Sequence, residues 1–552
     1  MIILNLAKKK NNNSNKMKLI YYINSKKFNT NKTNNDLELI AHQENNRFTL
    51  KIKALKDLTL GIAKKDIKFN INYKDVYFFN GYQSWTDSFE NKLKKRERNI
   101  HKSPHIISHM FAMDKYGDAS FYKYSIKKSH GYDVFYSKGK YESFIYNLNS
   151  NNAYLIIELI KDKKDIRLIS DTNGLKLKKG EEFVIFDYMF FTSFKEGLAS
   201  FNEAFPKRNL DKVFGYTSWY NYYQNINEEI ILRDLEALDD RFNLFQIDDG
   251  YETKVGDWLT IDPVKFPNGL KPIVNKIHEK GLKAGVWLAP FAAEEESELF
   301  KNHKELFVKD KKGHYLKAGG NWSGFYALNM ENNEARKYVE KSLKYYLDMG
   351  FDFFKLDFLY ASHIIPKKGL TRAQSAKENY KFLREILGDK IILGCGANTF
   401  SSNETFDYLR VGPDVSLIFD DVWFMRLFHR ERISTKVTIQ NTIYRSFMND
   451  HLFGNDPDVF LLRDDNINLS EGQKHALITI NALFGNVLMT SDDIAVYDDS
   501  KKEKLSNAFD IFYHATNKEY SKKGNCIEIK YELNNKKYNL LYDTKRGEII
   551  NG

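Results

Sequence analysis

Three patterns in the 552-residue sequence predict a multidomain protein. Residues 17–205 alternate apolar and polar side chains in short runs, residues 206–503 alternate apolar strands with helical stretches, and residues 504–552 contain a hairpin pattern. The predicted fold is an N-terminal antiparallel β-sandwich, a central (β/α)8 TIM barrel and a short C-terminal β-sheet. Residues 1–16, rich in lysine and asparagine, are predicted to be a disordered tail, with a translation start at Met17 as the alternative.

The sandwich prediction rests on strand periodicity. Runs such as FTLKIKAL, IKFNINY and AYLIIELI place apolar residues at every second position, and asparagine, lysine and glycine separate the runs. No long amphipathic helix pattern interrupts them. Short strands with frequent turns are typical of an antiparallel sandwich.

The barrel prediction rests on eight candidate strands with helical stretches such as EARKYVEKSLKYYLDMG between them. Eight strands that alternate with helices are typical of a TIM barrel. The strands are predicted at 213–220, 243–251, 282–290, 351–358, 391–397, 408–414, 451–460 and 486–493, and the seventh has the weakest pattern. The run CIEIKYELNNKKYNLLYD predicts the hairpin of the last sheet.

Composition argues against several function classes. The net charge of +11 is spread along the chain rather than gathered in one patch, so no nucleic-acid partner is expected. Two cysteines, far apart in sequence, give neither a disulfide framework nor metal-ligand spacing. Apolar runs fall short of the roughly 18 residues of a membrane helix. We expect a cytoplasmic protein without a membrane anchor, metal or cofactor, and its oligomeric state stays open.

Charged and polar residues gather where the predicted barrel strands end. A single aspartate after a strand often caps a helix or closes a turn. Active sites of TIM barrels, however, are built at the carboxyl ends of the strands, so a set of such residues at matching positions predicts a site. The set is Asp248, Asp249, Trp287, Lys355, Asp357, Cys395, Arg410, Asp414, Asp492 and Asp493.

The residue types in this set favour glycoside hydrolysis. Two carboxyl groups can act on an acetal while aromatic and polar side chains hold a sugar. The segments DDG and NDPD offer oxygen ligands but lack the spacing of a calcium loop. The acidic MTSDD after the eighth strand disfavours a phosphorylated substrate, because barrel phosphate sites use glycine-rich loops and helix N-termini.

Several motifs occur along the chain in a fixed order: FNGYQSW, QIDDGYE with GDW after it, FPNGLKPIVNKIHEKGLKAGVWLAPF, FFKLDF, GCGA and LRVGPDV. In this combination, from about Asn80 to Asp493, the chain resembles the retaining α-galactosidases of glycoside hydrolase family 36. The resemblance implies hydrolysis of terminal α-D-galactosyl residues from α-galactosides of the melibiose or raffinose type, through a covalent galactosyl-enzyme.

The resemblance also implies residue roles. Asp357 in KLDF matches the family's nucleophile, and Asp414 in RVGPD matches its acid/base. Asp248 and Asp249 resemble the pair that recognises the galactose hydroxyls. Further positions matched to sugar contact or pocket lining are Lys355, Arg410, Trp287, Tyr220 and Cys395, together with Trp85 from the sandwich.

These roles lead to an electrostatic expectation. Lys355, two residues from Asp357 on the same strand face, and Arg410 are expected to favour an ionised Asp357. Asp414 must hold its proton until it donates, so it is expected where its pKa is raised.

Three alternatives stay open. Galactosyl transfer to a sugar acceptor, as in raffinose-type synthases, and α-N-acetylgalactosaminidase activity need only pocket changes, the second of them room near Cys395. A galactoside-binding protein without activity is the non-enzyme alternative. Specificity for the leaving group is expected in the loops 292–300 and 317–326.

Overall fold

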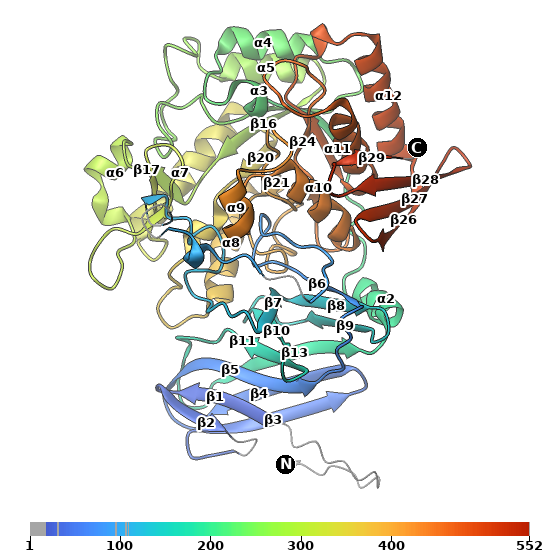
Figure 1. Cartoon of the computed structure of the whole chain (residues 1–552). Helices are drawn as coiled ribbons and strands as arrows, with labels where there is room; N and C mark the ends of the chain where they lie inside the picture. The colour runs from blue at the N-terminus through green and yellow to red at the C-terminus, as the bar shows by residue number, and fades with distance from the viewer. Residues whose placement is uncertain (1–17, 30–32, 94–96, 105–107, 109, 551–552) are drawn as a thin grey trace.

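The computed structural model describes residues 18–29, 33–93, 97–104, 108 and 110–550. The predicted tail, residues 1–16, lies outside these ranges. Figure 1 shows two antiparallel sheets stacked at the N-terminal end, a strand-and-helix body above them and a small sheet beside that body. The predicted combination of sandwich, barrel and short last sheet is confirmed.

The sandwich consists of two antiparallel sheets around an apolar core. Strand β4 shows why the period-two pattern works, since its residues alternate between solvent and the core. One sheet has the order β2-β1-β5-β11-β10-β7, with β12 beside β5: Lys18–Ile23 (β1), Lys26–Asn29 (β2), Leu58–Lys68 (β5), Lys128–Tyr132 (β7), Leu155–Ile160 (β10), Asp165–Ser170 (β11) and Lys176–Leu177 (β12). The other has the order β3-β4-β13-β9-β8-β6: Leu37–Glu44 (β3), Arg47–Ala54 (β4), Val76–Phe79 (β6), Val134–Lys138 (β8), Ser143–Asn147 (β9) and Glu182–Phe191 (β13).

The central sheet is parallel and curls into a barrel, with the order β23-β22-β21-β20-β16-β15-β14-β25-β24. Its end strands β23 and β24 are consecutive in the chain, so the two edges of the sheet meet. The strands are Val213–Thr217 (β14), Leu244–Ile247 (β15), Lys283–Leu288 (β16), Phe353–Leu356 (β20), Ile391–Gly394 (β21), Tyr408–Arg410 (β22), Gly454–Asp456 (β23), Val459–Phe460 (β24) and Val487–Thr490 (β25).

The seventh predicted strand is the one that differs. The structure divides residues 451–460 into β23 and β24, with Pro457 and Asp458 between them. Proline cannot donate a ladder hydrogen bond, and Asp458 has a left-handed φ of 73°. A break at this point explains the weak strand pattern in the sequence.

Helices cover the barrel and carry recognisable end signals. In α7 the Asn332 side chain caps the N-terminus, Gly350 ends the helix with a φ of 97°, and Val339, Leu343 and Tyr346 face the core. The α-helices are Phe194–Ala204 (α2), Trp219–Tyr222 (α3), Glu228–Ala237 (α4), Lys271–Glu279 (α5), Glu298–Asn302 (α6), Asn333–Met349 (α7), Arg372–Leu387 (α8), Trp423–Phe428 (α9), Thr435–Tyr444 (α10), Glu471–Phe484 (α11) and Asp499–His514 (α12).

Within the described residues, no helix has both the length and the apolar character that crossing a membrane requires.

Smaller elements complete the chain. A three-stranded sheet lies in the region after β16: Ala292–Glu294 (β17), Lys317–Gly319 (β18) and Phe325–Ala327 (β19). The last sheet is antiparallel: Thr516–Lys523 (β26), Cys526–Leu533 (β27), Lys536–Asp543 (β28) and Glu548–Ile549 (β29). The 3-10 helices are Ile100–Lys102 (η1), Lys304–Leu306 (η2), Leu359–His363 (η3), Ser446–Met448 (η4) and Ile494–Val496 (η5).

A buried arginine joins the sandwich to the barrel. Arg445, directly after α10, is fully buried and donates to Asn80 Oδ1 at 2.9 Å and to the carbonyl oxygens of Ser84 and Val411 at 2.5 and 2.7 Å. Asn80 and Ser84 belong to the sandwich segment that follows β6, whereas Val411 follows β22. This contact holds a sandwich loop against the carboxyl end of the barrel, where the predicted site lies.

Candidate active site

A cavity of about 490 Å³ opens where the carboxyl end of the barrel meets the sandwich. Asp357 and Asp414, which follow β20 and β22, both line it, and so does Trp85 from the sandwich. The structure therefore brings together the two predicted catalytic carboxyl groups and the predicted sandwich tryptophan. The other lining residues are Phe111, Met113, Tyr116, Gly320, Asn321, Phe358, Pro413, Ser416, Asp421, Met425, His429, Glu431, Arg432 and Ile433.

Two hydrogen bonds orient the Asp357 carboxyl group. The indole Nε1 of Trp287 donates to Oδ2 at 3.1 Å, and the backbone N–H of Phe358 donates to Oδ1 at 2.7 Å. Phe358 has a left-handed φ of 50°, which is unusual for a bulky residue and turns the chain sharply after the strand. Trp287, predicted as a pocket residue, thus contacts the predicted nucleophile directly.

The pKa of Asp357 is raised to about 6. Burial is the largest cause, because it disfavours the charged form, and the negative charge of Asp414 adds to it. Lys355 lowers the pKa, as expected from the sequence, but does not outweigh burial. Both carboxyl groups line the same cavity.

Arg410 contacts Asp414 rather than Asp357. Its guanidinium donates to Asp414 Oδ1 at 2.9 Å, while the backbone N–H of Ser434 donates to the Asp414 carbonyl at 3.1 Å. The Asp414 side chain is 39% exposed, and it lines the cavity. The expectation that Arg410 would favour an ionised Asp357 therefore differs from the structure, because β22 directs the arginine to its own following loop.

Arg410 also contacts Asp456, at the end of β23, and Asp458, directly before β24. Arg410 Nε donates to Asp456 Oδ2 at 2.9 Å, and its terminal nitrogen lies 2.8 Å from Asp458 Oδ1. Asp458 also accepts hydrogen bonds from the Tyr220 hydroxyl and, at 2.7 Å, from the backbone of Val415. Burial raises the pKa of Asp458 to about 7. The sequence showed these residues only as NDPD, a weak candidate for calcium, and their role beside Arg410 was missed.

Asp248 and Lys355 form a buried ion pair, and neither residue lines the cavity. Lys355 Nζ lies 2.8 Å from Asp248 Oδ2, and the Gln246 side chain donates to the same oxygen at 2.6 Å. Burial is the largest single influence and lowers the pKa of Lys355, but the charge of Asp248 together with those of other neighbours, among them Asp357, outweighs it, so the net shift is upward. The predicted residues of β15 and β20 are therefore in contact, with Lys355 held charged.

Asp249 has partners that the sequence did not indicate as site residues. It accepts from Gln224 Nε2 at 3.0 Å and from Trp322 Nε1 at 2.8 Å. Burial raises its pKa, and burial with the neighbouring charge of Asp249 raises that of Glu252 strongly. Trp322 lies in the loop 317–326, for which the sequence predicts leaving-group specificity, and its indole contacts the predicted sugar-binding aspartate.

The remaining predicted residues lie around these groups. Cys395 is 1% exposed, and burial raises the pKa of its thiol well above the ordinary value, which makes it a poor nucleophile. Trp85 packs edge to face on Phe358 with ring centroids 5.4 Å apart. Asp493 caps η5 through the N–H of Ala495 at 3.0 Å. Asp492 is buried in an ion pair at 2.8 Å from Arg463.

Comparisons with known proteins agree with the fold and the motifs. Residues 214–390 match the model of the Melibiase family. An α-galactosidase of Escherichia coli is 31% identical over 162 residues, which cover 28% of this chain and 22% of that protein. The chain therefore aligns with less than a quarter of that relative's length.

Two solved structures extend the likeness over most of the chain. The α-galactosidase TtGalA from Thermus thermophilus, in complex with p-nitrophenyl α-D-galactopyranoside, gives a TM-score of 0.70 at 22% identity and covers 91% of this chain and 98% of its own. The family 36 α-galactosidase AgaA from Geobacillus stearothermophilus gives a TM-score of 0.62 at 11% identity and covers 92% of this chain and 72% of its own. At these identities the likeness shows the fold, and with the family match it confirms the resemblance seen in the sequence.

Proposed function

We propose that this chain, which carries a Melibiase-family domain at residues 214–390, hydrolyses terminal α-D-galactosyl residues from α-galactosides with retention of configuration. The observation that carries the proposal is that Asp357 and Asp414 line one cavity at the ends of β20 and β22. A retaining glycosidase needs two such carboxyl groups about 5 to 5.5 Å apart.

In the first step, Asp357 attacks the anomeric carbon while Asp414 transfers its proton to the departing oxygen. The C–O bond to the leaving group breaks, and a β-linked galactosyl ester of Asp357 forms. In the second step, Asp414 takes a proton from water, the water oxygen attacks the anomeric carbon, and the ester bond breaks. The product is α-galactose, and both carboxyl groups return to their initial states.

The electrostatics of the free protein support the proposed role of Asp357 as the nucleophile. With a pKa of about 6, Asp357 is mostly ionised at neutral pH, as a nucleophile must be. In the first step Asp414 must carry the proton that it transfers to the departing oxygen.

The buried ion pair of Asp248 and Lys355 supports a role in hydroxyl recognition. Asp248 and Asp249 offer carboxylate acceptors, and Lys355 and Arg410 offer fixed positive donors. Such charged hydrogen bonds to sugar hydroxyls are stronger than neutral ones.

We also propose that the domains divide at 17–205, 206–503 and 504–552, and that the protein works in the cytoplasm with both cysteine thiols free. Cell fractionation tests the location, and native protein in the culture medium contradicts it.

The direct test uses the purified chain with p-nitrophenyl α-galactoside. We expect release of p-nitrophenol, first appearance of the α-anomer of galactose in proton NMR spectra, and no comparable turnover of the β-galactoside. Turnover no greater than that of an Asp357→Gly preparation contradicts the proposed activity. First appearance of the β-anomer contradicts the retaining mechanism.

A further inference from the structure

We propose that Glu431 determines leaving-group specificity by hydrogen bonding to the hydroxyl groups of a sugar that occupies the outer half of the cavity. The inference rests on the proposed galactoside hydrolysis and names the chemical class of the second sugar site. It concerns the wall of the cavity that lies away from Asp248 and Lys355.

The wall is formed by the long segment that follows β22. Residues 415–433 leave the barrel after Asp414, form α9 and return to α10. His429, Glu431 and Arg432 at the end of this segment line the same cavity as Asp357 and Asp414. Because Asp414 faces the departing oxygen in the proposed mechanism, side chains next to it on this wall face the leaving group.

Glu431 is held in place by groups from the sandwich. The Thr86 hydroxyl donates to its Oε1 at 2.7 Å, and the glycine at position 117 leaves the space that its carboxyl group occupies. A Cβ atom at Gly117 would lie 2.3 Å from Glu431 Oε1. The described residues make no hydrogen bond to Oε2, so this oxygen stays available to a ligand in the cavity. Burial also raises the pKa of Glu431 to about 7, so that both its acceptor and its donor form are accessible near neutral pH.

Apolar side chains lie beside the polar ones on the outer wall. Met113 and Phe111 come from the sandwich, and Met425 and Ile433 come from the segment after β22. A sugar ring combines C–H faces with a rim of hydroxyl groups, so a wall that mixes apolar and polar side chains suits it. A purely apolar leaving group would cover the partly buried carboxyl group of Glu431 without giving it a second hydrogen-bond partner.

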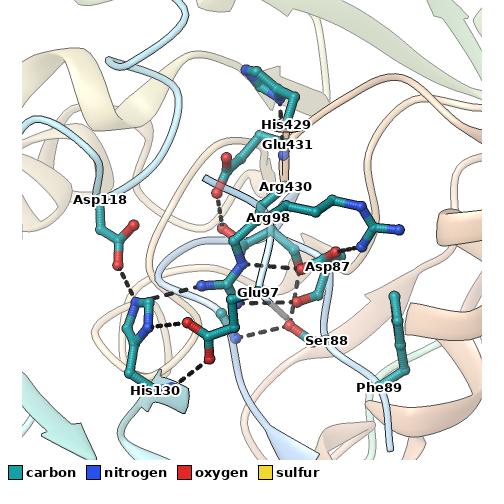
Figure 2. A network of polar contacts seen from close by, with 12 residues as sticks. Asp87, Ser88, Phe89, Glu97, Arg98, Asp118, His130, His429, Arg430 and Glu431 are labelled. Carbon is teal, nitrogen blue, oxygen red and sulfur yellow. Dashed lines mark hydrogen bonds and ion pairs between the residues drawn. The ribbon is translucent and has the colours of Figure 1, made fainter. Parts of the chain in front are cut away.

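A polar network behind the wall fixes its position (Figure 2). Arg430 Nε donates to Asp87 Oδ1 at 3.0 Å, and the Asp87 N–H donates to the Arg430 carbonyl at 3.1 Å. His130 lies between Glu97 and Asp118, 2.7 Å from each carboxylate. These buried ion pairs hold the segment 415–433 against the sandwich. Glu431 is therefore already in position before a sugar binds.

The test compares two substrates on each protein. The chain and its Glu431→Ala variant are assayed with melibiose and with p-nitrophenyl α-galactoside. We expect the ratio of kcat/KM for melibiose to kcat/KM for the aryl substrate to fall about tenfold or more in Glu431→Ala. Melibiose loses a hydrogen bond to the carboxyl group, whereas the aryl leaving group makes no such bond. The fraction of folded, active protein cancels in this ratio. Glu431→Gln is expected to recover part of the loss.

A second readout is the fate of the galactosyl-enzyme. With the aryl galactoside as donor and melibiose as acceptor, the ratio of transfer product to free galactose reports sugar binding at the same place. We expect this ratio to fall in Glu431→Ala and, to a smaller extent, in Thr86→Val, which loses the hydroxyl that positions Glu431. Glu182→Gln is the matched control, because Glu182 pairs with Lys51 on the exposed surface of the sandwich and does not line the cavity.

The outcomes separate this inference from the proposed function. No turnover of the aryl galactoside by the unaltered chain overturns the proposed hydrolysis itself. Aryl turnover with equal loss for both substrates in Glu431→Ala, or with no loss, overturns the specificity role and leaves hydrolysis standing. Hydrolysis of the aryl galactoside without any turnover of melibiose or other galactosyl sugars overturns the choice of a sugar leaving group.

Discussion

The two halves of the cavity are built differently. The barrel side, called the floor here, consists of Asp357, which lines the cavity, and of the Asp248–Lys355 ion pair, which does not line it but stands at the ends of strands in the same parallel sheet. The outer wall consists of Trp85, Tyr116 and Glu431, which come from loops of the sandwich and from the segment after β22. The floor depends on barrel register alone, whereas the wall requires two domains to be docked.

This difference predicts a division of roles. Floor residues are fixed by a fully bonded β-sheet, so changing them should impair the chemical steps without unfolding the protein. Wall residues are fixed by ion pairs across a domain interface, so changing them should affect stability and leaving-group selectivity more than chemistry. The experiments below test this division, beginning with the change for which we expect the greatest loss.

The strongest effect is expected at Asp357. Asp357→Gly should reduce turnover of an aryl galactoside by about 10⁴-fold or more, because no group remains to form the glycosyl ester. Asp414→Ala should differ, since a good aryl leaving group departs without protonation and the ester then accumulates for want of a base. The measurement is single-turnover kinetics with both variants.

Covalent trapping provides the control for this pair. A 2-deoxy-2-fluoro galactosyl reagent followed by peptide mass mapping should label Asp357 in Asp414→Ala and label nothing in Asp357→Gly. Azide yields the β-galactosyl azide with either variant, so product stereochemistry does not distinguish them. A label on Asp414, Asp248 or Cys395 would overturn the assignment of roles.

A smaller but still large effect is expected at Asp248. Asp248→Ala removes a hydroxyl acceptor and leaves the buried Lys355 without its ion-pair partner, so kcat/KM should fall by about 10² to 10³-fold. The matched control is Asp493→Ala, another strand-end aspartate, which caps η5. That change should cost about 1 kcal/mol of stability with little change in kcat/KM. Equal losses of kcat/KM in the two variants would contradict a specific role of Asp248 in sugar binding.

The floor residues could be predicted from the sequence, whereas in the wall only Trp85 was predicted, through the family resemblance. Asp248, Lys355 and Asp357 stand at the ends of apolar runs, and the strand count places such ends on one face of the barrel. Asp456 and Asp458 were missed because their strand is broken at Pro457, which hides the pattern. Glu431 and Thr86 are 345 residues apart, and nothing local in either segment indicates that they meet.

At the wall, Arg430→Ala should mainly lower stability. Arg430 is 6% exposed and pairs with Asp87, which keeps Arg98 as its remaining partner. Loss of one partner from a buried ion pair costs about 3 kcal/mol, and we expect a lower midpoint of thermal unfolding with a smaller change in kcat for the aryl substrate. The control is Lys51→Ala, which breaks an exposed sandwich pair and should cost well under about 1 kcal/mol. A loss of activity comparable to that of Asp248→Ala would contradict the division between floor and wall.

The smallest expected effect is a shift in pH dependence, and it tests whether the two catalytic carboxyl groups interact as the structure indicates. For the free protein, kcat/KM on an aryl galactoside with a good leaving group should rise with pH through about 6, because Asp357 must lose its proton to act as nucleophile. The charge of Asp414 contributes to that raised pKa. Asp414→Asn removes a like charge while keeping the shape, so ionisation of Asp357 becomes easier and the midpoint should move to lower pH, by about one pH unit or less. The matched variant Trp287→Phe removes the indole N–H that stabilises the charged form, so the midpoint should move to higher pH. Opposite shifts in the two variants identify the titrating group as Asp357. A midpoint that stays fixed in both, or that moves upward in Asp414→Asn, would show that another group controls the acid limb.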